Sequence, residues 1–281
     1  MRYISRYSAI DYGRCKASHF PDWHVHLSEI VSTQSDAAKA LIVSGQAKTT
    51  SALHLSVSVR SFRAERVSEF VGAIIEGDSA KAREISHSLG AFDVGLTREL
   101  SQARAWLRAR RRGTERAGLL ASSNALRLKP EGVYVKAKIE PALWFLAPRE
   151  DVRSSDALED AATEFDVQGL ELDWACVCWD GNFRRSNGDW GTFSFKGTKW
   201  QSVNDEARKH YLANTYRVLL TRARQGMVIF VPRGDVLDST RAPDLYDAIH
   251  EYLQECGFPT LDGSDTQDMK KAPQWGLQHS I

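Results

Sequence analysis

An amide, a glycine and a carboxylate stand together just before an almost wholly apolar run. Gln168 and Gly169 are followed by Glu171, and the apolar run begins at Leu172. In α/β proteins, backbone groups and polar side chains beside the end of a buried strand are the groups that meet a ligand. The spacing therefore marks a candidate binding site, although it does not identify the ligand.

Two arginines are predicted at junctions between a helix and a strand, where they are available for chemistry. Arg222 follows a helix-patterned segment and precedes a strand-like run, Met227–Val231. Arg60 lies between a strand predicted over 53–59 and a helix whose apolar residues recur at the i, i+3, i+4 spacing. Ligands in α/β proteins bind at the carboxyl ends of strands, so the ends of elements are where a site is expected.

Basic and aromatic residues gather in two further segments. The first, RAWLRARRRGTER, holds Arg111 and Arg112 at a predicted helix end. The second, DGNFRRSNGDWGTFSFKGTKWQ, interleaves Trp190 and other aromatics with arginines and lysines. Both could contact nucleic acid through phosphates and stacked bases. The alternatives are a solvated helix end that favours the dipole and a hairpin whose aromatics pack on the core.

The composition limits the classes of protein that fit. The 281 residues suffice for one large domain or two small ones, and a hydrophobic content of 42% provides a core. The net charge of +1 indicates neither a nucleic-acid nor a membrane partner, although it can hide a basic cleft. No stretch has the roughly 18 apolar residues needed to cross a bilayer. These features predict a soluble, cytoplasmic protein.

The cysteines and histidines do not predict a metal site. The four cysteines are Cys15, Cys176, Cys178 and Cys256, and none forms a C-x-x-C pair. His24 and His26 would share one face of a strand predicted over Trp23–Leu27, but no acid or cysteine accompanies them. Reduced, buried thiols and structural histidines are the expected roles.

Strands alternate with helices along most of the chain, which predicts an α/β fold with a mostly parallel sheet flanked by helices. We expect a weakly patterned segment over 1–50, a lobe over 51–258 and a polar tail over 259–281 that is loose after Thr260. The strands expected in the lobe cover 53–59, 92–95, 117–121, 133–139, 172–179 and 227–231, with a turn at 225–226 and a hairpin-like aromatic and basic insertion after 179. The expected helices cover 61–76, 79–88, 97–112, 155–162, 204–222 and 245–256.

Three segments resemble motifs IV, V and VI of superfamily-one helicases, in the family's order. They are LHLSVSVRSFRAE, VQGLELDW and YRVLLTRARQGMVIF. From about Trp23 to Cys256 the chain also resembles the C-terminal part of the Schlafen-group helicase-like family, including GLLASSNALRLKP, DVRSS and ATEFDVQGLELDW. The resemblance implies a second RecA-like lobe, which closes over ATP bound on a first lobe.

Two catalytic residues follow from the resemblance. Arg222 matches the motif VI arginine that reaches the γ-phosphate, and Arg60 matches the motif IV arginine that contacts the same phosphates. A permanent, planar cation at that place stabilises the charge that builds on the transferred phosphoryl group. Arg224 is expected to be structural.

The resemblance also implies binding roles for the segment around motif V. Glu171 matches the motif V acid, and Gln168 and Gly169 would present an amide side chain and a backbone N–H to the nucleotide. Thr163 and Phe165 match positions that touch the nucleic-acid strand. The implied partner is single-stranded DNA or RNA.

The chain departs from the family in lacking the phosphate-binding half of the site. No G-x-x-x-x-G-K-[ST] loop occurs. The acidic pair that would hold magnesium after an apolar strand is also missing, because Asp205-Glu206 opens a helix. We therefore expect ATP with Mg²⁺ only if another chain supplies a first lobe, no nucleotide bound by this chain alone, and no hydrolysis by it alone. Two alternatives stay open: a nucleic-acid-binding module without ATPase activity, and an adaptor that docks a protein partner.

Overall fold

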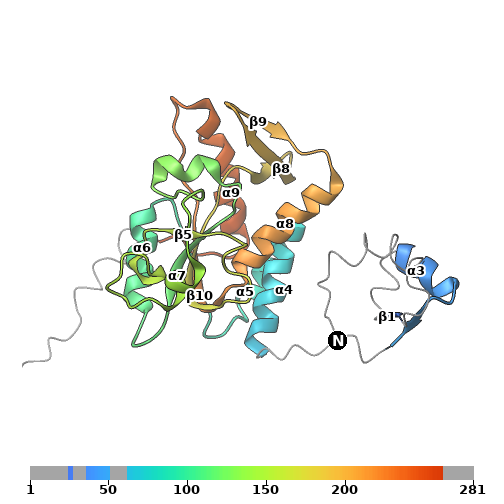
Figure 1. Cartoon of the computed structure of the whole chain (residues 1–281). Helices are drawn as coiled ribbons and strands as arrows, with labels where there is room; N and C mark the ends of the chain where they lie inside the picture. Colours follow the sequence, from blue (N-terminus) through green and yellow to red (C-terminus); the bar gives the residue numbers. More distant parts are fainter. Residues whose placement is uncertain (1–24, 28–35, 51–61, 262–281) are drawn as a thin grey trace, which may run out of the picture. The chain divides into compact units, whose positions relative to one another are not determined.

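The computed structural model describes residues 25–27, 36–50 and 62–261, and the chain forms two compact units, residues 1–59 and 60–281 (Figure 1). In the smaller unit, β1 (Val25–Leu27) pairs in parallel with β2 (Ala47–Thr49), and α3 (Asp36–Val43) connects toward β2. His26 Nδ1 lies 2.8 Å from the Thr50 hydroxyl, so this histidine has a structural partner. The strand predicted over 23–27 is confirmed in its described part.

Five strands in the described part of the larger unit form an entirely parallel sheet, in the order β3-β10-β6-β4-β5. They are β3 (Asp93–Thr97), β4 (Ala117–Ala121), β5 (Ala161–Ala162), β6 (Leu172–Cys178) and β10 (Ala223–Phe230). The helices that flank the sheet complete the α/β fold that the sequence pattern predicts, and the arrangement is consistent with the RecA-like lobe that the resemblance implies. The last strand, β10, lies between the first strand of this sheet, β3, and the fourth, β6. Because all neighbouring strands are parallel, the connections between them are crossovers.

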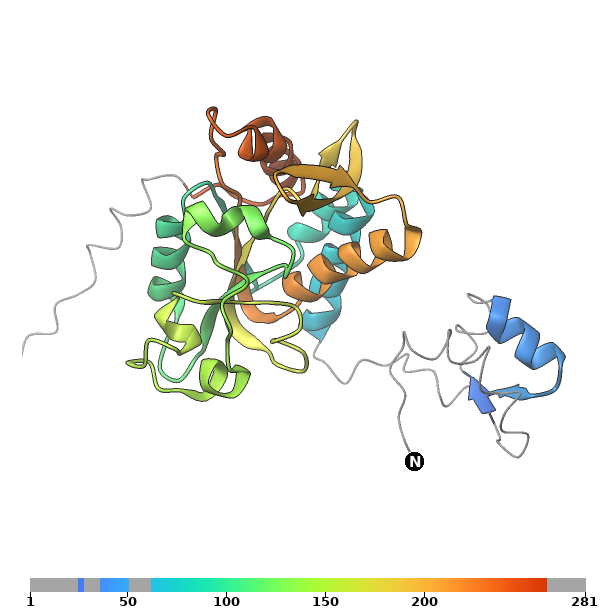
Figure 2. The same ribbon diagram turned by 45° about the horizontal axis from the view of Figure 1, so that its top comes forward.

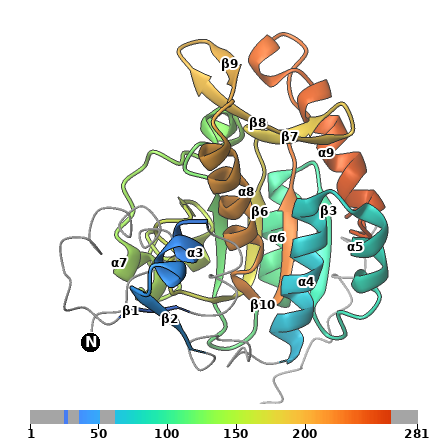
Figure 3. The same ribbon diagram turned by 90° about the vertical axis from the view of Figure 1, so that its right-hand side faces the viewer.

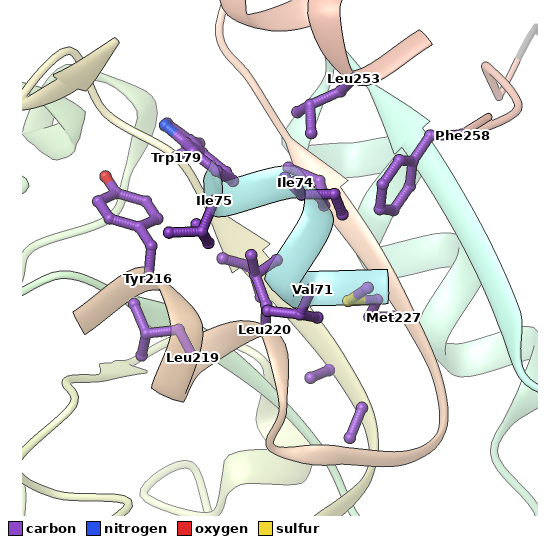
Figure 4. Close-up of a cluster of buried hydrophobic side chains, with 14 of the residues drawn as sticks. Val71, Ile74, Ile75, Trp179, Tyr216, Leu219, Leu220, Met227, Leu253 and Phe258 are labelled. Carbon is purple, nitrogen blue, oxygen red and sulfur yellow. The ribbon is translucent and has the colours of Figure 1, made fainter. Parts of the chain in front are cut away.

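Helices cover both faces of this sheet, because its central strands are apolar on both sides (Figures 2 and 3). Met227 and Ile229 of β10 face one core cluster, and Val228 and Phe230 face the other. The first cluster is covered by α4 (Phe62–Glu76), α5 (Ser79–Ser86), α8 (Glu206–Leu220) and α9 (Asp244–Glu255), and Figure 4 shows part of it. The second is covered by α6 (Leu100–Arg110) and the short helix η2 (Leu126–Glu131).

The predicted insertion after β6 forms a small antiparallel sheet. It consists of β7 (Phe183–Ser186), β8 (Asp189–Lys196) and β9 (Lys199–Ser202), and it lies beside α9 at the end of the main sheet where β6 finishes (Figures 1 and 3). Asp205 then caps α8 by accepting a hydrogen bond from the backbone N–H of Arg208 at 2.8 Å.

The strand predicted over 133–139 is wrong. This described segment forms turns and irregular backbone, and α7 (Pro141–Leu146) follows it. Val133 and Val135 are buried while Tyr134 and Lys136 are exposed, which is the alternation that suggested a strand. Both sides of β4 are occupied, by β6 and β5, and segment 133–139 pairs with no strand of the sheet. Alternating burial alone does not create a strand when no hydrogen-bonding partner exists.

One further expectation, at the start of β10, is corrected. Gln225 and Gly226, predicted to form a turn, lie inside β10 at a register shift between Ala223 and Gly226. The first residues of the polar tail contact β3: the Leu96 N–H donates to the Pro259 carbonyl at 2.9 Å, and the Leu261 N–H donates to the Leu96 carbonyl at 2.8 Å. The strand predicted over 53–59, Arg60, Cys15 and residues 262–281 lie outside the described residues.

The helix predicted over 155–162 is shorter in the structure. Residues 155–162 contain the 3₁₀ helix η3 (Ser155–Ala157) followed by β5.

Among the residues with described positions, no helix is long and apolar enough to cross a membrane. The thiols of Cys176, Cys178 and Cys256 are free and buried.

Candidate functional site

The segment before β6 and the arginine before β10 lie at the same edge of the main sheet. β6 begins at Leu172 and β10 at Ala223, and these two residues are partners in adjacent parallel strands. Gln168–Glu171 and Arg222 therefore meet at the edge where the strands begin, called here the amino edge. Ligands of α/β sheets generally bind at the opposite, carboxyl edge. The expectation that was based on this rule therefore does not account for the place of these residues.

The structure brings Arg222 into contact with the segment that holds the other predicted nucleotide ligands. Its Nη1 donates to the Leu170 carbonyl at 3.3 Å, and its Nε donates to the Val218 carbonyl at 3.1 Å. The Arg222 carbonyl in turn accepts a hydrogen bond from the Leu172 N–H at 2.9 Å. The guanidinium is half-buried and oriented by backbone groups on two sides. The predicted convergence of Arg60 on this place falls outside the described residues.

Gly169 has a backbone conformation that explains its residue type. Its φ is +79°, in the left-handed region, and a Cβ there would meet no described heavy atom within 4 Å. Glycine therefore serves the turn and not close packing. Gln168 and Gly169 are exposed, and Glu171 is half-exposed.

A hydrogen-bonded acid beside this edge was not predicted. Glu115 accepts hydrogen bonds from Trp174 Nε1 at 2.9 Å, the Arg112 N–H at 2.9 Å and Gln225 Nε2 at 2.7 Å. The hydrogen bond from Trp174 is the largest of the causes that lower the pKa of Glu115. Because its partners come from three segments far apart in sequence, no local pattern could have indicated the group.

The arginine cluster at the end of α6 contains a buried ion pair, half-buried paired arginines and exposed arginines. Arg111 Nη1 lies 2.8 Å from Asp156 Oδ1, with side-chain exposures of 10% and 4%. Asp156 also accepts a hydrogen bond from the Ala117 N–H at 2.9 Å and pairs with Arg116. These contacts favour a structural role for Arg111. Arg112 is exposed and lies at the amino edge. A nucleic-acid role for either arginine stays a prediction.

The aromatic residues of the insertion face the body of the lobe. Trp190 Nε1 donates to the Ile74 carbonyl at 2.8 Å, and its ring stacks on Phe183 with centroids 4.4 Å apart. Trp200 Nε1 donates to the Thr240 carbonyl at 2.8 Å. Lys196 and Lys199, by contrast, are exposed. This arrangement favours the packed hairpin over a stacking surface for bases, and the nucleic-acid role of Trp190 stays a prediction.

Thr163 and Phe165 lie at the carboxyl edge of the sheet, opposite to Arg222. They follow β5 directly, as Ser123 follows its neighbour β4. Thr163 is buried, and both its N–H and its hydroxyl donate to Asp166 Oδ2, at 2.8 Å and 2.6 Å. Phe165 is 56% exposed and stacks against Tyr211 of α8, with ring centroids 6.5 Å apart and planes 30° apart.

A buried acid holds this turn in place. Glu164 accepts hydrogen bonds from the Ser123 N–H and hydroxyl, both at 2.8 Å. Burial, followed by the charge of the neighbouring Glu164, raises the pKa of Tyr211. Neither Glu164 nor Tyr211 was predicted for the site. Tyr211 had only its place in an amphipathic helix as a signal, which suggests core packing.

The carboxyl edge also holds a buried polar network that sequence patterns did not indicate. Asp180 accepts hydrogen bonds from the Arg127 N–H at 2.9 Å and the Tyr246 hydroxyl at 3.0 Å. The Tyr216 hydroxyl donates to Asn182 Oδ1 at 2.7 Å. Burial raises the pKa of Asp180. The network joins α8 and α9 to the loop after β6, which is a structural role.

No cluster of three or more potential metal ligands occurs in the part of the chain that the structure describes.

Apart from Trp190 in the insertion, the predicted site residues that the structure describes lie at opposite edges of one parallel α/β lobe, joined by segment 163–171. The five-stranded parallel sheet flanked by helices defines the class as a RecA-like lobe. A family model described as "Schlafen group 3, DNA/RNA helicase domain" matches residues 17–233, which is well over half of the chain. The protein therefore belongs to that family, as the sequence resemblance implies. Membership indicates a helicase-like, nucleic-acid-related function. Neither the search of curated proteins nor that of solved structures gave a match.

Proposed function

We propose that this lobe acts as the second half of a nucleic-acid-dependent NTPase. It supplies Arg222 to ATP and Mg²⁺ held by a separate first lobe, and it contributes part of a track for single-stranded DNA or RNA. The contact between Arg222 Nη1 and the Leu170 carbonyl carries the proposal, because it unites the two segments that resemble motifs V and VI.

The geometry at Arg222 suits the stabilisation of phosphoryl transfer. Two backbone carbonyls orient the guanidinium plane, so little reorganisation is needed when a phosphate arrives. Arg60 would contact the same phosphates. Gln168, Gly169 and Glu171, which stand in the adjacent turn, would contact the nucleotide with an amide, a backbone N–H and a carboxylate.

Trans-activation by this chain tests the nucleotide part of the proposal. A first lobe from a Schlafen-group relative is expressed separately, and phosphate release from Mg-ATP is followed with and without this chain. We expect no release by this chain alone and stimulation when both are present. Arg222→Ala should remove most of the stimulation, since arginines that reach the transferred phosphate are worth roughly 10³-fold or more.

Arg224→Ala provides the matched control. Arg224 is two residues away, is exposed, and lies 3.6 Å from Asp173, so its loss removes an equal charge from the same edge. We expect this variant to keep the stimulation. Phosphate release by this chain alone that Arg222→Ala abolishes would contradict the proposal, as would stimulation that Arg222→Ala leaves intact.

A second candidate function is nucleic-acid binding without nucleotide chemistry. The exposed stacking of Phe165 on Tyr211 favours it, because this pair lies at the edge away from Arg222 and needs no nucleotide to form. Persistent binding of a single-stranded oligonucleotide, together with failure to stimulate any first lobe, would select this candidate.

A further inference from the structure

We infer that Phe165 and Tyr211, here called the aromatic pair, form a stacking platform for the bases of single-stranded nucleic acid, flanked by Arg208 and Lys136 as phosphate contacts. The inference rests on the proposed function and goes beyond it. Family resemblance points to Phe165 alone, whereas Tyr211, Arg208 and Lys136 are assigned here from the structure.

The exposure of the aromatic pair is the first observation. Phe165 is 56% exposed and Tyr211 is 45% exposed, whereas Tyr216, five residues further along α8, is fully buried. Two adjacent, exposed rings offer π-faces to a ligand at little cost in conformational entropy. Every nucleobase has such a face, so binding by stacking tolerates any sequence.

The geometry of the pair is the second observation. The ring centroids lie 6.5 Å apart, near the upper end of the range for aromatic pairs, with planes 30° from parallel. Rings at this spacing do not cover each other closely. The exposed faces can therefore stack with a base without first breaking a compact contact.

Hydrogen bonds hold the turn that carries Phe165, which suits a preformed binding surface. Glu164 precedes Phe165, is buried, and accepts hydrogen bonds from the N–H and hydroxyl of Ser123, while its charge acts on Tyr211. Asp166 holds the turn by accepting from the N–H and hydroxyl of Thr163. Glu164 is thus a positioning residue, and its carboxylate faces protein donors.

Two exposed basic side chains belong to the elements that carry or support the pair. Arg208 is exposed and precedes Tyr211 by three residues on α8, so both lie on the same face of the helix. Lys136 is exposed, and its Nζ donates to the carbonyl of Ser123, the residue that binds Glu164, at 2.9 Å. Exposed rings with cations on the adjoining segments match a surface that stacks bases and holds their phosphates.

The decisive measurement is the affinity of the full-length chain for fluorescein-labelled dT16 and U16, by anisotropy over a range of salt concentrations. Tyr211→Ala and Phe165→Ala should each weaken binding roughly 5- to 150-fold, as expected for loss of one stacked base. Tyr211→Phe keeps the ring and should bind within about twofold of the unmodified chain. Tyr211→Leu keeps apolar area without a π-face and should resemble Tyr211→Ala.

The salt dependence separates stacking from phosphate contact. Loss of a phosphate contact reduces the slope of log K against log salt by about 0.7 for single strands. We expect this reduction for Arg208→Ala and Lys136→Ala, but not for Tyr211→Ala. Arg149→Ala is the matched control: this exposed arginine donates to the Gly113 carbonyl at the opposite, amino edge, and its loss should leave the slope unchanged.

The outcomes distinguish this inference from the proposed function. Binding that tolerates Tyr211→Ala and Phe165→Ala overturns the platform while leaving a nucleic-acid-binding lobe intact. Equal losses for Tyr211→Phe and Tyr211→Ala also overturn it, because stacking does not need the hydroxyl. If the unmodified chain binds neither oligonucleotide at low salt, the nucleic-acid part of the proposed function fails together with the platform.

Discussion

At the scale of single residues, the local backbone explains why Arg222 occupies its position. A side chain at the end of α8 would ordinarily be free to sample solvent, yet the Val218 and Leu170 carbonyls hold Nε and Nη1. Arginine suits this arrangement because its fork presents donors in several directions, whereas lysine presents one compact ammonium. The proposed phosphate role and the observed backbone contacts are compatible for this reason.

Two glycines at the amino edge should respond differently to alanine. Gly169→Ala places a Cβ in open space at φ +79°, so only backbone strain of about 1–2 kcal/mol is expected. Gly226→Ala would place its Cβ 2.6 Å from the Asp93 carbonyl oxygen and 2.7 Å from Trp174, so the sheet must shift. We expect that cost to exceed the cost at Gly169, with overpacking of about 1–3 kcal/mol or more. Urea unfolding of both variants would show this order, and equal costs would contradict it.

At the scale of elements, the insertion is attached through its aromatic residues. Trp190 of β8 contacts α4 through the Ile74 carbonyl and meets Tyr252 of α9 edge-on, with centroids 5.2 Å apart. Trp179, at the end of β6, stacks on Trp190 at 5.3 Å. The small antiparallel sheet is thus packed on the first core cluster and is not an independent arm.

Trp190→Ala should therefore act on stability. Loss of a half-buried indole and its hydrogen bond is expected to cost about 2–3 kcal/mol, below the range for a fully buried tryptophan. The affinity of the folded fraction for an oligonucleotide should not change. Thermal unfolding and anisotropy, measured on the same preparation, test both statements. A large loss of affinity without loss of stability would support the stacking role for Trp190 that the sequence suggested.

Elements with strong local patterns were predictable, and contacts between distant segments were not. The apolar runs that became β4 and β6 and the periodic segments that became α4 and α8 match the structure to within a few residues. The segment 133–139 failed because strand formation depends on a neighbour. The stacking of Phe165 on Tyr211 joins residues 46 positions apart in sequence, and only the crossover topology brings them together.

At the scale of the whole lobe, the two groups of candidate residues are separated by the height of the sheet. The five residues of β4 span about 13 Å between the amino and carboxyl edges. Segment 163–171 covers this distance, beginning beside Ser123 and ending beside Arg222. A nucleotide and a nucleic-acid strand could thus occupy the lobe together without sharing side chains.

The stability of the lobe should carry a specific dependence on pH through His250 of α9. Burial, followed by the charge of Arg98, lowers the pKa of His250 from 6.5 to about 4; Asp247 opposes this and Arg233 adds to it. The unfolded chain gains a proton as the pH falls through 6.5, while the folded chain keeps His250 neutral to about 4. The free energy of unfolding should therefore decrease across this window and be unaffected above it.

Asp180, whose pKa burial raises, changes the free energy of unfolding with pH in the opposite direction. The effect of His250 is therefore isolated by comparison with the variant His250→Gln. Urea unfolding at about pH 7.5 and about pH 5 should show a smaller loss of stability in the variant. An equal loss in both proteins would mean that His250 is not held neutral by the fold.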